Sequence, residues 1–146
     1  MIYSPSTCKA CNIMYDAHKD DIDKGGYPYV FHPFYVANQM DDEDSCCVAL
    51  LHDVIEDHGD RYSIDDIRVA GFNDKVVEAL ILLTHDEAVP YMDYIRSIGT
   101  NSIATRVKMA DLRHNMDSSR VGGKRARKYD TYVEAYEYLS NIVKNG

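Results

Sequence analysis

The sequence predicts an all-α fold in a single domain that spans residues 1–146. Apolar residues recur at three- and four-residue steps through most segments, which is the period of an amphipathic helix and not of a strand. Short polar stretches with Gly or Pro separate these segments, and no linker or internal repeat divides the chain. A length of 146 residues with 45% hydrophobic residues also suits one core of ordinary size.

Three helices are expected in the N-terminal part of the chain. Residues 6–19 carry an apolar stripe, and the paired glycines that follow mark a loop. Pro33 suits the first turn of a helix that runs to about Met40, so His32 falls at its N-terminal edge. The third helix begins at an Asp cap, carries acids in its first turn, and is expected to run to about Glu56.

Five further helices are expected in the rest of the chain. Ser63 and Asp66 have the spacing of a capping box, which opens a short helix. The segment 76–84 is apolar on nearly every side, which predicts a place in the core. Of the remaining three helices, one is expected to begin near Pro90. The next is expected to run from Asn101 or Ser102 to about Met116, and the last from Lys128 to about Lys144.

The charge balance limits the class of partner. The chain has 16 Lys and Arg against 24 Asp and Glu, for a net charge of −8. An acidic surface argues against non-specific nucleic-acid binding, which needs Lys and Arg to neutralise phosphates. The longest apolar run, 76–83, is far short of a membrane span, and the first residues lack the pattern of a signal peptide. We therefore expect a cytoplasmic protein that binds neither nucleic acid nor a membrane.

A run of polar residues interrupts the apolar pattern of the third helix. The run comprises His52, Asp53, Glu56 and Asp57. Such groups are costly to bury unless a metal ion, one another or water satisfies them. In a helix, His52 lies over Glu56 and Asp53 lies over Asp57. Because His52 and Asp53 themselves point about 100° apart, they converge on one ion only if other segments close the site. Metal binding and a helix end that turns to solvent are both compatible with the spacing.

Two other segments hold polar residues that would complete such a site. His32 precedes Pro33, which stiffens the backbone and aims the imidazole, although a packed or surface histidine is the more common case. Asp111 lies in an apolar helix, with Lys108 and Asn115 on the same face. A carboxylate in that position needs a partner, and either a salt bridge to Lys108 or a shared metal ion would supply one.

Together these residues follow the order of a known pattern, a His, then a His-Asp pair, then a later Asp. This order resembles the HD-domain superfamily of metal-dependent phosphohydrolases, whose members form a single helical bundle. Three blocks are closer to the hydrolase domain of alarmone enzymes, which remove pyrophosphate from the 3′ position of guanosine tetra- or pentaphosphate, (p)ppGpp. The blocks are Ala17-His18-x-x-x-x-x-Lys24-x-Gly26-x-Pro28-Tyr29-x-x-His32-Pro33, Leu50-Leu51-His52-Asp53-x-x-Glu56-Asp57 and Lys108-x-Ala110-Asp111-x-x-His114-Asn115.

The resemblance implies a divalent metal ion and a role for each matched residue. Two imidazoles and two carboxylates form a mixed N/O site that suits Mn²⁺ and leaves room for water. The ion would make a bound water molecule nucleophilic near neutral pH, and this water would attack a phosphorus atom. The implied roles are metal ligand for His32, His52, Asp53 and Asp111, orientation or deprotonation of the water for Glu56 and Asp57, and contact with a small-molecule nucleotide substrate for Lys24, Lys108 and Asn115.

One position departs from the alarmone pattern. Asp23 stands where those enzymes usually carry an Arg that helps to hold the guanine base, and a carboxylate neither stacks like a guanidinium nor attracts phosphate. The resemblance indicates hydrolysis of a nucleotide polyphosphate such as guanosine 3′,5′-bis(diphosphate) at its 3′-pyrophosphate. The alternatives are a nucleotide or dinucleotide phosphatase or phosphodiesterase, and a non-catalytic metal-dependent nucleotide sensor. Glu56 and Asp57 argue against the sensor, because binding needs no base.

Charge is distributed unevenly along the chain. Residues 41–66 contain ten acids and one Arg, whereas residues 106–128 contain eight bases and two acids. The basic segment either faces a phosphate group or forms an ordinary solvated loop. A second His-Asp dipeptide, His85-Asp86, lies in a predicted loop with no acid pair after it, so we expect it to be incidental.

Overall fold

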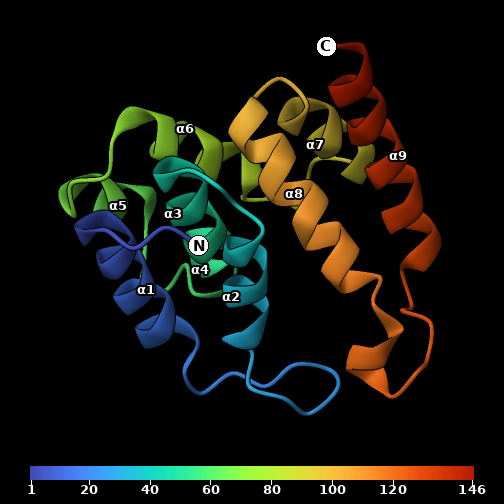
Figure 1. Cartoon of the computed structure of the whole chain (residues 1–146), viewed down its shortest axis with the longest axis horizontal. Coiled ribbons are helices and arrows are strands. Elements are labelled where there is room, and N and C mark those ends of the chain that lie inside the picture. The colour runs from blue at the N-terminus through green and yellow to red at the C-terminus, as the bar shows by residue number, and fades with distance from the viewer.

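Helices make up most of the computed structural model, which describes residues 1–146 (Figure 1). In chain order they are α1 (Pro5–His18), α2 (Phe31–Asn38), α3 (Glu43–Leu51), α4 (Val54–Asp57), α5 (Ile64–Val69), α6 (Asp74–Leu83), α7 (Tyr91–Ile98), α8 (Ser102–Asn115), the 3₁₀ helix η1 (Ser118–Val121) and α9 (Tyr129–Asn145). The sole strand-like pairing is an isolated bridge between Ile22 and Pro28. The predicted all-α fold is confirmed. None of the helices is long and apolar enough to cross a bilayer.

Side-chain caps set the starts of several helices. Ser4 and Ser63 open α1 and α5 with reciprocal capping boxes. Asp42, Asn73 and Asn101 each accept a backbone N–H at the start of α3, α6 and α8. Asp42, Ser63 and Asn101 fall at positions where the sequence carried cap signals, so these helix starts agree with the prediction.

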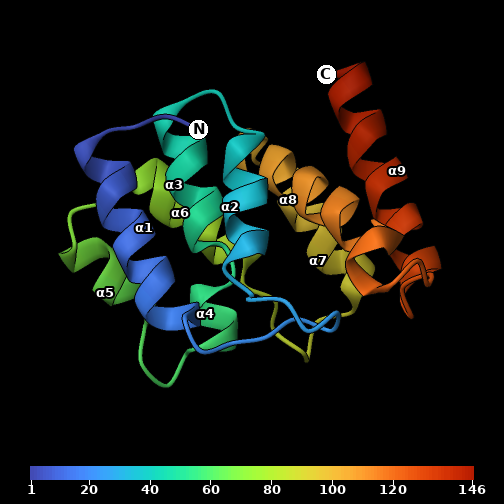
Figure 2. The same ribbon diagram turned by 60° about the horizontal axis from the view of Figure 1, so that its bottom comes forward.

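Helix α3 is the centre of the core. It contacts α1, α2, α6 and α8, and every residue from 45 to 51 is buried. Figures 1 and 2 show α1 and α2 on either side of it. Helix α6 packs against α3 and α8 and has five buried residues, which agrees with its predicted place in the core, although Ile81 is half exposed. Helix α9 lies beside α8 and α7, at the far end of the molecule from α1.

The helix that was expected to run from Asp42 to about Glu56 is interrupted, and this part of the prediction is wrong. Helix α3 ends at Leu51, and the turn between α3 and α4 contains His52 and Asp53. In a continuous helix these two polar side chains would point about 100° apart, and one would be buried away from the partners of the other. The turn allows both to face the same point while the helical pattern resumes at α4.

Two irregular segments lie at the same end of the bundle, at the bottom of Figure 1. Residues 19–30 join α1 to α2, and residues 116–128, which include η1, join α8 to α9. The two segments touch at Gly25, where a Cβ atom would lie 1.9 Å from the carbonyl oxygen of Arg120. Only glycine permits so close an approach of two backbones. These segments form one side of the cleft described next.

Candidate metal centre

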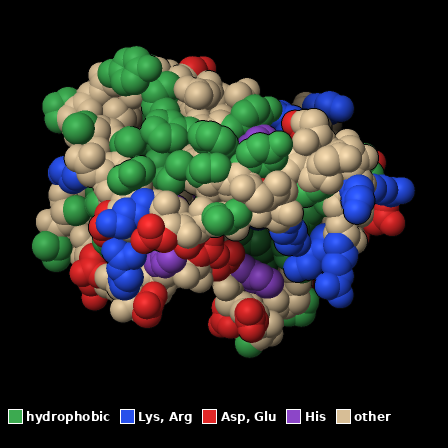
Figure 3. All heavy atoms as spheres, turned by 90° about the horizontal axis from the view of Figure 1, so that it is seen from below, with side chains coloured by type: hydrophobic (Ala, Val, Ile, Leu, Met, Phe, Trp, Pro, Cys, Tyr) green, Lys and Arg blue, Asp and Glu red, His purple; other side chains and the backbone are tan.

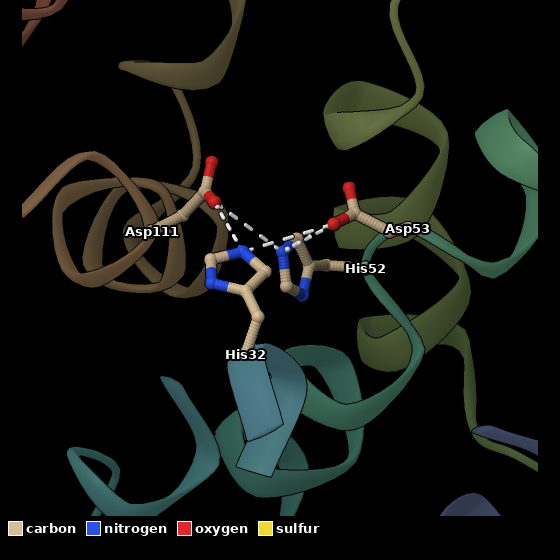
Figure 4. Close-up of side chains that lie close together, drawn as sticks. All are labelled: His32, His52, Asp53 and Asp111. Carbon is tan, nitrogen blue, oxygen red and sulfur yellow. Dashed lines mark hydrogen bonds and ion pairs between the residues drawn. The ribbon is translucent and has the colours of Figure 1, made fainter. Parts of the chain in front are cut away.

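Four side chains from separate parts of the chain point toward one another in Figure 4. His32 comes from α2, His52 and Asp53 from the turn between α3 and α4, and Asp111 from α8. One ligand atom from each lies within 4.8 Å of the ligand atoms of the other three. Their side chains are between 2% and 18% exposed. The structure therefore brings together the four residues that the sequence pattern assigned to a metal ion; we call them the His-Asp cluster.

His52 directs an unused nitrogen into this cluster. Its Nδ1–H donates to the carbonyl of Ala49 at 2.6 Å, so Nε2 carries the lone pair whenever the ring is neutral. That Nε2 is buried and makes no hydrogen bond. It nevertheless lies 3.1 Å from Asp53 Oδ2 and 3.5 Å from Asp111 Oδ1. A buried nitrogen without a proton donor, close to two carboxylate oxygens, is the arrangement expected around a cation.

His32 is held in a similar orientation. Its Nε2 lies 2.8 Å from Asp111 Oδ1 and 3.8 Å from Asp53 Oδ2. On the other side of the ring, Nδ1 lies 2.7 Å from Nδ1 of His114. Burial, followed by the charge of Arg120, lowers the pKa of His114 to about 4, so His114 is neutral and can accept a hydrogen bond from the Nδ1–H of His32. This bond turns Nε2 of His32 toward the carboxylates.

Further hydrogen bonds fix the two carboxylates. The hydroxyl of Tyr29 donates to Asp53 Oδ2. Asp111 accepts from Lys108 Nζ at 2.8 Å and from Asn115 Nδ2 at 3.1 Å. Although burial opposes ionisation, the Lys108 charge and the two imidazoles hold the pKa of Asp111 well below its usual range. Lys108 thus makes the salt bridge that the sequence allowed, and it does so beside the His-Asp cluster.

Glu56 and Asp57 lie on α4 at the solvent-facing mouth of the site. Desolvation by the surrounding atoms, followed by the charges of Asp53 and Glu56, raises the pKa of Asp57 to about 7. Desolvation also raises the pKa of Glu56, although a hydrogen bond at 2.7 Å from the backbone N–H of His85 opposes this rise. A carboxyl group with a pKa near neutrality is suited to exchange a proton with water.

His85 and His114 are among the residues at the site that were not given a role from the sequence. His85, which was expected to be incidental, holds Glu56 and lines the same hollow as the acid pair. No sequence pattern marks this contact, because a backbone N–H is available at almost any position. His114 belongs to the third sequence block. It follows Asp111 by three residues in a helix, and this spacing could have indicated that it faces the same site.

Two adjoining hollows, of about 540 and 480 Å³, form one cleft above the His-Asp cluster. The smaller contains the acid pair and Lys108, and the larger contains Lys24. The predicted substrate residues are therefore spread along the cleft instead of meeting at one point. The two hollows share Tyr29, Asn115, Lys128 and Tyr132.

The larger hollow has a strongly basic lining, which we call the basic wall. Figure 3 shows Lys and Arg side chains gathered beside a depression in which histidine and acidic side chains are visible. Segment 106–128 was interpreted either as a segment that faces phosphate or as an ordinary solvated loop. Its placement along the cleft favours the segment that faces phosphate. The basic wall comprises Lys24, Arg120, Lys124, Arg125, Arg127 and Lys128.

Asp23 lies in the same hollow but its carboxylate is already engaged. Its Oδ1 accepts the backbone N–H groups of Gly25 and Tyr27, each at 2.9 Å. Its Oδ2 lies 3.8 Å from Nη2 of Arg120, and the side chain is 12% exposed. The acid therefore shapes its own loop and pairs with a guanidinium from the opposite segment, which reduces its repulsion of a phosphate.

The chain is an all-α helical bundle. No family model matches the chain. Among solved structures, the chain is similar to a metazoan ortholog of SpoT that hydrolyzes ppGpp and plays a role in starvation responses. The similarity has a TM-score of 0.74 at 22% sequence identity, and it covers 98% of this chain and 88% of that chain. The fold that the three sequence blocks implied is thereby confirmed over nearly the whole chain.

Proposed function

We propose that this chain is a metal-dependent phosphohydrolase that acts on a small-molecule nucleotide, with its 146 residues acting as one domain. The observation that carries this proposal is the buried, unpaired Nε2 of His52 among the carboxylates of Asp53 and Asp111. A second imidazole and an acid pair lie beside the same point, and the basic wall lines the adjoining hollow. Likeness to the fold of a ppGpp hydrolase also supports it.

The His-Asp cluster would hold one divalent ion, and its two imidazoles and two carboxylates suit Mn²⁺. When bound, such an ion makes water more acidic and polarises a phosphoryl oxygen. His114 and Tyr29 keep their partners His32 and Asp53 turned toward the centre. Because these outer contacts are preformed, little reorganisation is needed when the ion binds.

The acid pair would handle the proton of the attacking water. Asp57, with a pKa of about 7, accepts the proton, and Glu56, held by the His85 N–H, orients the water. Lys108 lies close enough to the cluster to offset the negative charge that develops on the transferred phosphoryl group. Each role uses a group that faces the smaller hollow.

The two-part cleft favours a nucleotide with phosphate groups at two positions. The scissile group would occupy the smaller hollow near Lys108, while the basic wall would bind the other phosphates. Asn115 lies at the junction of the two hollows, where it would contact the nucleoside. Guanosine 3′,5′-bis(diphosphate), cleaved at its 3′-pyrophosphate, is the candidate that combines this geometry with the sequence blocks.

Product analysis with Mn²⁺ tests the proposal on guanosine tetraphosphate, nucleoside monophosphates, dinucleotides and cyclic nucleotides. Release of pyrophosphate from guanosine tetraphosphate alone is the expected result. Release of products from the other substrates, but not from guanosine tetraphosphate, would support the phosphatase or phosphodiesterase alternative. Tight nucleotide binding with no product from any of them would contradict an enzymatic role and indicate a sensor.

A further inference from the structure

A second group of potential metal ligands lies near the His-Asp cluster but shares no residue with it. His18 ends α1, Asp21 lies in the loop that follows, and His58 follows α4. One ligand atom from each lies within 4.8 Å of the others. None of these residues has a part in the proposed hydrolysis, so their association needs its own explanation.

The three side chains meet at one oxygen atom. Asp21 Oδ2 lies 3.0 Å from His18 Nδ1 and 2.6 Å from His58 Nε2. The two imidazole rings stand nearly perpendicular, with their centroids 5.0 Å apart. His18 is fully buried, whereas the side chains of His58 and Asp21 are 19% and 35% exposed. The group is therefore closed toward the core and open to solvent on the Asp21 side.

The ring of His18 is oriented so that it could bind a cation through Nδ1. Its Nε2 is buried and makes no hydrogen bond, while Nδ1 faces Asp21. A cation would therefore bind Nδ1, with the proton of the neutral ring on Nε2. Burial also lowers the pKa of His18, so the imidazole is neutral and able to coordinate a cation at neutral pH.

We propose that His18, Asp21 and His58 form a second metal site, which binds Zn²⁺ with the fourth position open to water. Two imidazoles and one carboxylate are a donor set of three-ligand zinc sites. Tetrahedral bonds of about 2.0–2.2 Å place ligand atoms about 3.3 Å apart. The contacts at 2.6 and 3.0 Å must therefore open by less than about 1 Å. The exposed side chain of Asp21 has room to make that movement.

An ion at this site would fix the loop that borders the cleft. Asp21 donates its N–H to the carbonyl of His18, and its own carbonyl accepts the N–H of Tyr29, both at 2.9 Å. The ring of Tyr29 lies 4.9 Å from that of His18, and its hydroxyl donates to Asp53. The second ion would thus join the end of α1, the loop that carries Lys24, and the segment after α4.

Zinc stoichiometry of the metal-free, full-length chain, measured by calorimetry, tests this proposal. The wild-type chain is expected to bind two ions, Asp53→Ala one, Asp21→Asn one, and the double variant none. Asp20→Asn is the matched control, because it removes the same charge from the exposed neighbouring residue and is expected to leave two ions bound. Co²⁺ substitution should add the strong visible absorption of a tetrahedral site in Asp53→Ala but not in Asp21→Asn.

The second-site proposal is overturned if Asp53→Ala binds no zinc, or if Asp21→Asn binds as many ions as Asp20→Asn. Its failure is distinguishable from failure of the proposed function. If the His-Asp cluster binds no ion, the wild type and Asp53→Ala each bind one and Asp21→Asn binds none. Far-UV circular dichroism verifies the helical fold of each variant, and His58→Gln carries the same expectation if Asp21→Asn does not fold.

Discussion

The His-Asp cluster and the basic wall meet in one cleft but are built in opposite ways. The cluster is supplied by helix ends and one helix interior, and three of its four residues are buried. The basic wall is supplied by two irregular segments, and most of its side chains are exposed. Hydrogen bonds from Tyr29, His114, Lys108 and Asn115 fix the cluster, whereas Lys24, Lys124 and Arg127 have no side-chain partner in the structure.

This difference suggests that the cluster would carry out catalysis and that the basic wall would select the substrate. A rigid centre with preformed outer contacts positions reacting groups for any substrate that reaches it. An exposed rim of Lys and Arg attracts phosphate through charges that several residues share, and salt screens this attraction. Changes in the cluster should therefore affect turnover of every substrate, whereas changes in the basic wall should alter binding of some substrates more than others.

The largest effect is expected from Asp53→Ala. Loss of this carboxylate removes a proposed ligand and one of the two carboxylates that lie near the Nε2 atoms of both imidazoles. Mn²⁺ binding, measured by calorimetry, and turnover should both fall below detection. Asp60→Ala, at an exposed acid in the turn after α4, is the control and should retain both. Full activity in Asp53→Ala would refute the assignment of the site.

Asp57→Asn should separate chemistry from metal binding. Removal of a general base is expected to slow turnover about 10²–10⁴-fold. Mn²⁺ should remain bound, since all four members of the His-Asp cluster are unchanged. The wild-type rate should rise with pH through the pKa of Asp57, about 7 before the positive ion lowers it, and this inflection should vanish in the variant. A retained inflection would assign the proton transfer to another group.

The members of the cluster could be predicted from the sequence because their order resembles that of a known family and because cation chemistry favours these residue types. The helix starts were predictable for a similar reason, since Ser63, Asn73 and Asn101 are cap residues whose contacts lie within three positions along the chain. The break at His52 and Asp53 was not predictable, because the apolar residues on both sides keep a helical pattern. Tertiary contacts with His32 and Asp111 favour the turn.

The basic wall was only partly predictable. Its composition was visible as a basic segment, but its position depends on two loops that meet at Gly25 and Arg120, far apart in sequence. The environment of Asp23 illustrates the limit. Residue type indicated repulsion of phosphate, whereas the structure engages that carboxylate with two backbone N–H groups and a guanidinium. Such pairings follow from loop geometry, which spacing along the chain does not specify.

A several-fold effect is expected from Arg127→Gln in the basic wall. The guanidinium lines the larger hollow and has no carboxylate partner, so its loss should raise KM about 3–10-fold and leave kcat nearly unchanged, as for an interaction made equally in ground and transition states. Arg68→Gln, on α5 outside the cleft, is the matched control. Steady-state kinetics at two salt concentrations should show a weaker salt dependence in Arg127→Gln alone. A fall in kcat with unchanged KM would place this residue in the chemical centre.

The smallest effect concerns the stability of the metal-free chain. Folding raises the pKa of Asp57 from 3.8 to about 7, so the folded state holds this proton more tightly than the unfolded state. The resulting stabilisation is complete below pH 3.8 and is lost as the pH rises through about 7. Asp57→Asn, which stays neutral, should therefore raise the Tm relative to wild type by a few degrees at pH 8, with the difference shrinking toward pH 4. An equal Tm difference at both pH values would show that Asp57 is not destabilised by its acidic neighbours, and the proton-accepting role would then lose its electrostatic basis.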